Sequence, residues 1–299
     1  MELVRRAAAT YLETAVGSDA ARLRFLEGLW EIQADIESLA RPYAPPPGAE
    51  AAEALVNGQT LFALSAPEIP IAAYSDAVDR IARYTGERAG LPAEQADALK
   101  STDFSAVLNE ERLAGAIHSP DAFVAQVVSD LGAHPSGPLT PATLAFVLIS
   151  ALVPFLVGPS EAALSALGVF DRRAWGHGRC PVCGAAASLG RMGESTSLKG
   201  AERVLWCGVC HAEWGYERIR CVRCGTRNPD KLRYSHLEND PAHRIHLCDE
   251  CHGYAKFVFV NDLRKPLSMV VEDAVTTTLE EVALGNGYTA TGDGGQTSC

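Results

Sequence analysis

The amino-acid sequence predicts an α+β protein: an all-helical N-terminal domain, two tandem modules with four metal-binding cysteines each, and a C-terminal helix. Apolar residues recur at helical spacing through the first part, the composition changes at Asp171, and four Cys-x-x-Cys pairs follow. The expected boundaries are 1–170 for the helical domain, 171–216 and 217–262 for the two metal modules, 263–288 for the helix and 289–299 for a disordered tail.

The first part of the chain carries helical signals and no clear strand pattern. One apolar stripe on an otherwise charged segment comprises Phe25, Leu29, Ile32, Ile36 and Leu39. The pairs Ser119-Pro120 and Thr140-Pro141 indicate helix starts, because a hydroxyl can cap the helix and Pro loses no hydrogen bond at the first helical position. No nucleophile stands near a base in this part, so we expect no enzymatic activity.

The most apolar run, residues 144–157, is too short for a typical bilayer span, which needs about 20 residues. It also contains Ser150 and Pro154, so we expect a buried core helix and no membrane span. A separate short helix is expected at 162–167, opened by Ser160 and Glu161. The N-terminus runs directly into a helical pattern without the apolar segment of a secretory signal, which predicts a cytoplasmic protein.

The formal net charge of −11 disfavours a nucleic-acid partner, because attraction to phosphates needs a surplus of Lys and Arg. Residues 171–260 form the basic part of the chain. A divalent ion on four thiolates contributes about −2, so two filled sites would bring this region close to neutrality. The sequence therefore predicts no nucleic-acid partner.

The cysteines form an internal repeat. The unit from Cys180 to Cys210 recurs as Cys221 to Cys251, and flanking Arg, Gly and His residues recur under the same shift. The duplication predicts two metal sites with separate ligand sets. These are Cys180, Cys183, Cys207 and Cys210 for one ion, and Cys221, Cys224, Cys248 and Cys251 for the other.

The spacing of each pair suits a metal knuckle. Two intervening residues let both sulfurs turn toward one point, and Gly184 and Gly225 supply the backbone freedom that such turns often need. Two knuckles complete a tetrahedron with metal–sulfur distances near ~2.3 Å. A β-ribbon of about 40 residues has little core of its own, so we expect each ion, iron or zinc, to supply its folding energy.

Other interpretations of the cysteines are weaker. Disulfides are disfavoured in a cytoplasmic protein, and a thioredoxin-type pair would occur once, at a helix start. Pairing the first knuckle with the third is possible, but the duplication argues against it. Four sulfurs leave no open position for a catalytic water. We therefore expect the nearby histidines to lie outside the ligand sets: His211, His243, His246 and His252.

These motifs resemble the formate dehydrogenase accessory protein (FdhE) family between Gly178 and Tyr288. The motifs are Cys180-Pro181-Val182-Cys183-Gly184, Cys207-Gly208-Val209-Cys210, Arg220-Cys221-Val222-Arg223-Cys224 and Cys248-Asp249-Glu250-Cys251, the last followed by Gly253-Tyr254-Ala255-Lys256. The resemblance implies a helical N-terminal domain followed by two rubredoxin-like, or zinc-ribbon, modules.

The resemblance also implies a function. The chain would be a cytoplasmic accessory protein, an assembly chaperone that binds the catalytic subunit of a formate dehydrogenase before export or during cofactor loading. One alternative is a rubredoxin-like electron-transfer protein, because an iron ion on four cysteines is redox-active. The other is a nucleic-acid-binding zinc ribbon, against which the acidic balance of the chain counts.

Overall fold

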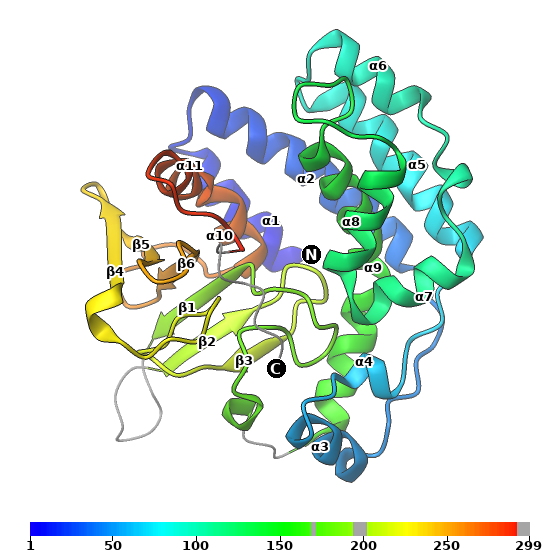
Figure 1. The fold of residues 1–299 in the computed structure, drawn as a ribbon. Helices are drawn as coiled ribbons and strands as arrows, with labels where there is room; N and C mark the ends of the chain where they lie inside the picture. The colour runs from blue at the N-terminus through cyan, green and yellow to red at the C-terminus, as the bar shows by residue number, and fades with distance from the viewer. Residues whose placement is uncertain (169–171, 194–201, 292–299) are drawn as a thin grey trace.

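The computed structural model describes residues 1–168, 172–193 and 202–291, and Figure 1 shows helices on one side and a sheet on the other. The N-terminal helices are α1 (Glu2–Leu12), α2 (Gly17–Glu37), α3 (Gly48–Val56), α4 (Leu61–Leu64), α5 (Ile71–Arg88), α6 (Ala93–Ser101), α7 (Glu110–His118), α8 (Pro120–Asp130) and α9 (Pro141–Ala166). Short 3-10 turns occupy Phe104–Ala106, Arg172–Trp175 and Pro229–Lys231. The predicted fold class is confirmed.

Both predicted Pro-marked helix starts are present, but only one hydroxyl caps its helix. The Thr140 hydroxyl accepts a hydrogen bond from the backbone N–H of Thr143 at 3.2 Å. The Ser119 side chain makes no such bond, and its backbone N–H instead donates to the carbonyl of Gly115 at the end of α7. The prediction of a hydroxyl cap is therefore wrong at Ser119, which is the one residue between α7 and α8.

Helix α9 is longer than expected, because it continues through Pro154 and Pro159 and includes the segment predicted as a separate helix. Pro154 cannot donate to the carbonyl of Ser150, four residues earlier. The Gln33 amide on α2 donates to that carbonyl at 2.8 Å and satisfies it instead. A neighbouring helix therefore supplies the hydrogen bond that proline removes.

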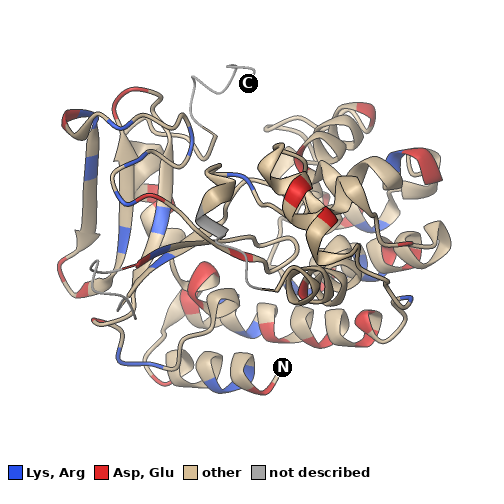
Figure 2. Ribbon diagram, turned by 90° about the horizontal axis from the view of Figure 1, so that it is seen from below, with Lys and Arg blue, Asp and Glu red and all other residues tan. Residues whose placement is uncertain are grey.

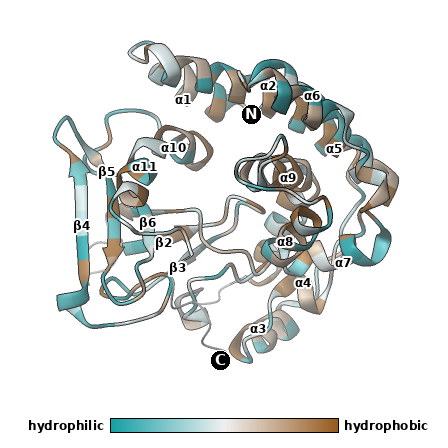
Figure 3. Ribbon diagram, turned by 45° about the horizontal axis from the view of Figure 1, so that its top comes forward, coloured by the Kyte–Doolittle hydropathy of each residue, from teal (hydrophilic) through white to brown (hydrophobic). Residues whose placement is uncertain are grey.

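Figure 3 shows α9 as a largely hydrophobic helix among α2, α5 and α8, all of which contact it. By length and composition alone α9 is apolar enough to cross a membrane, and half of its most apolar stretch is buried inside the protein. Leu144, Leu148 and Leu156 are fully buried. This packing is that of a core helix, as predicted for residues 144–157.

The cysteine region forms one mixed sheet in the order β3-β2-β1-β6-β5-β4. Its strands are β1 (Leu189–Gly193), β2 (Glu202–Trp206), β3 (Glu213–Gly215), β4 (Leu232–Leu237), β5 (Asp240–Cys248) and β6 (Tyr254–Phe259). Three antiparallel strands come from each repeat, and the parallel pairing of β1 with β6 joins the repeats.

The C-terminal segment contains two short helices, α10 (Met269–Val275) and α11 (Thr277–Gly285), divided at Thr276. Helix α10 packs Val271 against Ala7 and Ala8 of α1 and Leu23 of α2. Helix α11 packs its Leu279 onto the face of β5 and β6. Most of the tail expected over 289–299, including Cys299, lies outside the described residues, but Thr289 forms a β-bridge with Gly253.

A buried polar cluster fastens the sheet to both ends of the chain. His243 of β5 lies 2.7 Å from the Asp240 carboxylate and 2.6 Å from the Glu272 carboxylate of α10. The Tyr11 hydroxyl of α1 donates to Glu272 at 2.7 Å. Glu272 is fully buried and His243 is buried, and buried polar groups need hydrogen-bond partners. Their hydrogen bonds therefore link α1, β5 and α10.

Candidate metal centres

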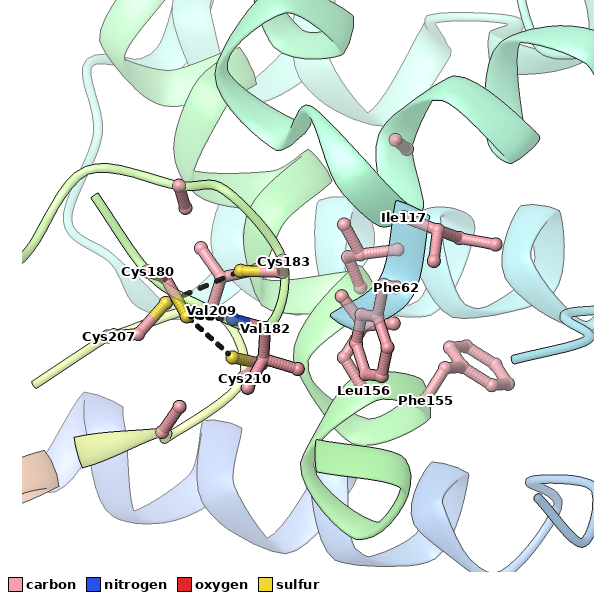
Figure 4. Packing of buried hydrophobic residues seen from close by; sticks show 14 of the residues in the cluster. Phe62, Ile117, Phe155, Leu156, Cys180, Val182, Cys183, Cys207, Val209 and Cys210 are labelled. Carbon is pink, nitrogen blue, oxygen red and sulfur yellow. Dashed lines mark hydrogen bonds between the residues drawn. The ribbon is translucent and has the colours of Figure 1, made fainter. Parts of the chain in front are cut away.

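The first four-cysteine group lies where two loops of the first repeat meet. Cys180 and Cys183 precede β1, and Cys207 and Cys210 follow β2. Figure 4 shows the four sulfurs turned toward one another, with Sγ–Sγ distances of 3.5 Å for Cys180–Cys210 and for Cys183–Cys207. The backbone N–H of Val182 points at the Cys180 sulfur at 3.3 Å. All four side chains are fully buried.

The second group has the same construction in the second repeat. Its Sγ–Sγ distances are 3.8 Å for Cys221–Cys251 and 3.8 Å for Cys224–Cys248. The backbone N–H of Arg223 points at the Cys221 sulfur at 3.3 Å, as in the first group. Cys224 is partly exposed, so this group lies nearer the surface.

The sulfur spacing suits a metal ion and not a disulfide. A tetrahedron with metal–sulfur bonds of about 2.3 Å has sulfur–sulfur edges of about 3.8 Å. A disulfide bond is about 2.05 Å long, far shorter than any of these separations. In each group all four ligand atoms lie within 4.8 Å of one another. Each group could therefore hold one ion, and the first knuckle does not combine with the third.

The residue after each knuckle adopts a left-handed backbone conformation. Gly184 and Gly225 have φ values of 75° and 77°, and His211 and His252 have values of 58° and 52°. This conformation lets the N–H of Gly184 reach the carbonyl of Cys180, and the N–H of His211 reach that of Cys207. The sequence indicated the left-handed conformation at the two glycines, because glycine adopts it readily. It did not indicate that the two histidines adopt the same conformation.

None of the four candidate histidines joins a four-sulfur group. His211 stacks on Trp206 at 5.1 Å between ring centroids, and His252 lies near the ring of Tyr288. His246 packs against Phe257 at 4.3 Å. Burial, with the nearby charges of Arg203 and Arg244, lowers the pKa of His246 to about 3. These rings support the strands and knuckles around the sulfurs.

The first group is built into the main hydrophobic core. The backbone N–H groups of Leu61 and Phe62, at the start of α4, donate to the carbonyls of Pro181 and Val182 at 2.9 and 3.0 Å. Asp121 of α8 accepts a hydrogen bond from the N–H of Ala186 at 3.1 Å. Figure 4 shows Val182 facing the apolar side chains of the helical domain. The first knuckle is therefore clamped to the helices.

The second group lies in a small cluster of its own, packed mainly against Leu232. In both groups burial raises the pKa of two thiols, which are Cys180 and Cys183 in the first group and Cys224 and Cys251 in the second. A cation at the centre of the first group is what would hold its buried sulfurs as thiolates. At the second group, Arg223 lies beside Cys221 and supplies positive charge directly.

Comparison with known proteins gives one consistent group of relatives, although no protein-family model matches the sequence. A protein FdhE homolog of Aquifex aeolicus is 33% identical over 147 residues, which are 48% of this chain and 49% of that protein. One of Shewanella oneidensis is 34% identical over 113 residues, 38% of this chain and 36% of that protein. The chain thus spans about half or less of the length of the curated relatives it matches.

A solved structure extends the similarity to almost the whole fold. The crystal structure of the FdhE protein from Pseudomonas aeruginosa matches with a TM-score of 0.55 and 20% sequence identity, over 96% of this chain and 92% of that one. At this identity the match establishes a shared fold. The sequence and fold similarities together confirm the resemblance predicted from the cysteine motifs.

Proposed function

We propose that this chain, which is similar to FdhE proteins in sequence and in fold, is an accessory protein that a formate dehydrogenase needs to become active. It acts as an assembly chaperone in the cytoplasm, where it binds the catalytic subunit before export or during cofactor loading. The observation that carries the proposal is the pair of four-sulfur groups set in this particular fold.

In this proposal the eight cysteines are metal ligands and each group holds one iron or zinc ion. The ions stabilise the knuckles and the sheet between them. Four sulfurs fill a tetrahedral coordination shell, so the ions would have no open position for a substrate or a water. This closed coordination supports a structural role and a non-enzymatic protein.

A second candidate function is electron transfer, which the partial exposure of Cys224 favours. An iron ion at the second group would lie near enough to the surface to exchange electrons with a partner. Iron-loaded protein would then show visible absorption that a reductant bleaches and air restores. A colourless protein that contains only zinc would exclude this candidate.

Deletion and complementation in the host test the accessory role. Loss of the gene is expected to abolish formate dehydrogenase activity while the catalytic subunit is still synthesised. The wild-type chain should restore activity and copurify with that subunit, whereas a Cys183→Ser/Cys224→Ser variant should not. Glu50→Gln, an exposed change on α3, is the matched control. Unchanged dehydrogenase activity after deletion would refute the proposal.

A further inference from the structure

A pocket of about 250 Å³ opens beside the second four-cysteine group. Its floor is the face of β4, β5 and β6 on which Tyr234, His246 and Ala255 are cross-strand neighbours. The loop that carries Cys221 forms one wall. The opposite face of these strands is covered by α11, so the pocket occupies the side that the helices leave open.

Five arginines line this pocket: Arg203, Arg218, Arg220, Arg223 and Arg233. Figure 2 shows blue segments on the strands and loops of this part of the molecule. Only Arg233 has a carboxylate partner among the described residues, Asp249 at 2.5 Å. A four-thiolate centre with a divalent ion would carry about −2, so a surplus of about two positive charges remains.

Three of these arginines, Arg203, Arg220 and Arg223, donate hydrogen bonds to backbone carbonyls. Arg203 donates through Nη1 to the carbonyls of Glu217, Arg218 and Arg220 at 2.8–3.1 Å. Its Nε is buried and has no hydrogen-bond partner among the described residues, although the side chain lines the pocket. Burial lowers the pKa of Arg203 to about 10, so its guanidinium is still charged at neutral pH.

The mouth of the pocket combines charge with exposed apolar surface. Arg218 is exposed, and its guanidinium has no partner among the described residues. The adjacent Ile219 is 58% exposed, and Tyr234 across the pocket is 67% exposed. Large apolar side chains this exposed beside unpaired cationic groups are typical of binding surfaces.

Strand β4 adds a third feature, because it is the edge of the six-stranded sheet. Within the described part of the chain it pairs only with β5, and most of its residues are exposed. Its outer backbone N–H and C=O groups are therefore available to an extended chain. Two of its side chains, Leu232 and Tyr234, also line the pocket.

We propose that this pocket and the β4 edge bind an extended segment of a partner protein that carries a carboxylate next to an apolar side chain. The carboxylate is received by the guanidinium groups of Arg203 and Arg218, which match its planar, bidentate geometry. The apolar side chain packs between Ile219 and Tyr234. This goes beyond the accessory role, because it applies to any partner with such a segment.

A nucleic acid is the less suitable polyanion for this surface. The chain as a whole carries a formal charge of −11, which repels an extended phosphate backbone outside the pocket. The pocket is small, and apolar side chains such as Val222, Leu232 and Leu247 make up much of its lining. A carboxylate would pair with the arginines of the lining, and an apolar neighbour of that carboxylate would pack against the apolar side chains.

The test is fluorescence anisotropy with a labelled peptide of alternating Leu and Glu, and with a matched peptide of Leu and Gln. The metal-loaded full chain is expected to bind the Glu peptide saturably and the Gln peptide at least about tenfold more weakly. An Arg218→Glu/Tyr234→Ser variant should also lose about tenfold in affinity. Both side chains are exposed, so its metal content and Tm should match the wild type.

Arg88→Glu is the control, since it makes the same charge change at an exposed site on α5. It should bind the Glu peptide as the wild type does. Equal binding of the two peptides, or an Arg218→Glu/Tyr234→Ser variant with unchanged affinity, would overturn the proposal. So would tighter binding of a single-stranded oligonucleotide at the same pocket. The assay contains no dehydrogenase, so such failures leave the accessory role standing.

Discussion

His243 contacts residues that are distant from it in the sequence. It follows the turn between β4 and β5, where its sequence neighbours suggest only a ribbon position near Cys248. Folding instead places it between the carboxylates of Asp240 and Glu272, with Tyr11 adjacent. Three segments that are distant in the sequence therefore depend on one imidazole.

The charge of His243 makes the stability of the fold pH-dependent. Burial alone would lower its pKa, but the hydrogen bonds and charges of Asp240 and Glu272 outweigh burial and raise the pKa to about 9. Because the pKa of His243 is higher in the folded chain, protonated His243 stabilises the fold fully at pH values below the pKa of histidine in the unfolded chain, ~6.5. It is then lost as the pH rises through about 9.

We therefore expect the Tm of the wild-type chain to fall between pH 7 and pH 10 by more than that of His243→Gln. The His243→Gln variant should already be less stable at pH 7, because it removes the imidazolium that contacts the fully buried carboxylate of Glu272. Thermal unfolding monitored by circular dichroism gives both values. His118→Gln, at an exposed site, is the control and should behave like the wild type. Identical pH profiles of Tm for the wild type and His243→Gln would contradict the role of His243 in pH-dependent stability.

At the scale of elements, the first knuckle of each repeat ends in the same kind of left-handed turn, but the two turns have different surroundings. A methyl group at Gly184 would lie 2.7 Å from the carbonyl oxygen of His118, where α7 ends. At Gly225 the nearest atom would be Arg220 Nη2 at 3.2 Å, which belongs to a flexible side chain. The first turn is docked on the helical domain, and the second is not.

Gly184→Ala and Gly225→Ala should therefore differ in their effect on stability. Both substitutions force alanine into a left-handed conformation, at a cost of about 1–2 kcal/mol. Gly184→Ala additionally forces α7 and the first knuckle apart, for a total of about 2–4 kcal/mol. Urea unfolding of the metal-loaded proteins measures the difference. Equal losses in the two variants would mean that the first knuckle is not clamped to the helices.

At the scale of the whole molecule, the two candidate metal centres are unequally protected. The first is part of the core that joins the helices to the sheet, and its four cysteines are fully buried. The second lies in a small separate cluster with one partly exposed cysteine. Opening the second site needs only a local fluctuation, whereas opening the first disrupts the shared core.

Chelation should then release the two ions in separate phases. Under native conditions a chromogenic chelator is expected to remove about one ion per chain quickly and the other only as the protein unfolds. Cys224→Ser should remove the fast phase and leave most of the helical circular dichroism intact. Cys183→Ser should remove the slow phase and destabilise the entire chain. A single release rate for both ions in the wild type would contradict this difference.

The sequence by itself determined the local and repeated features of this protein. Helical periodicity and the Pro-marked starts predicted α2, α8 and the first part of α9, because these signals act within a few residues. The shift of 41 residues between repeats grouped the eight cysteines in fours, because each group closes within a single repeat. The left-handed turns at Gly184 and Gly225 follow from the same local geometry.

Only the tertiary structure decided what joins these units. The parallel pairing of β1 with β6, the Gln33 bond that lets α9 continue through Pro154, and the clamp of α4 on the first knuckle all link distant segments. So does the arginine-lined pocket beside the second centre. Such contacts depend on which surfaces meet when the chain collapses, and no periodicity or spacing within one segment specifies them.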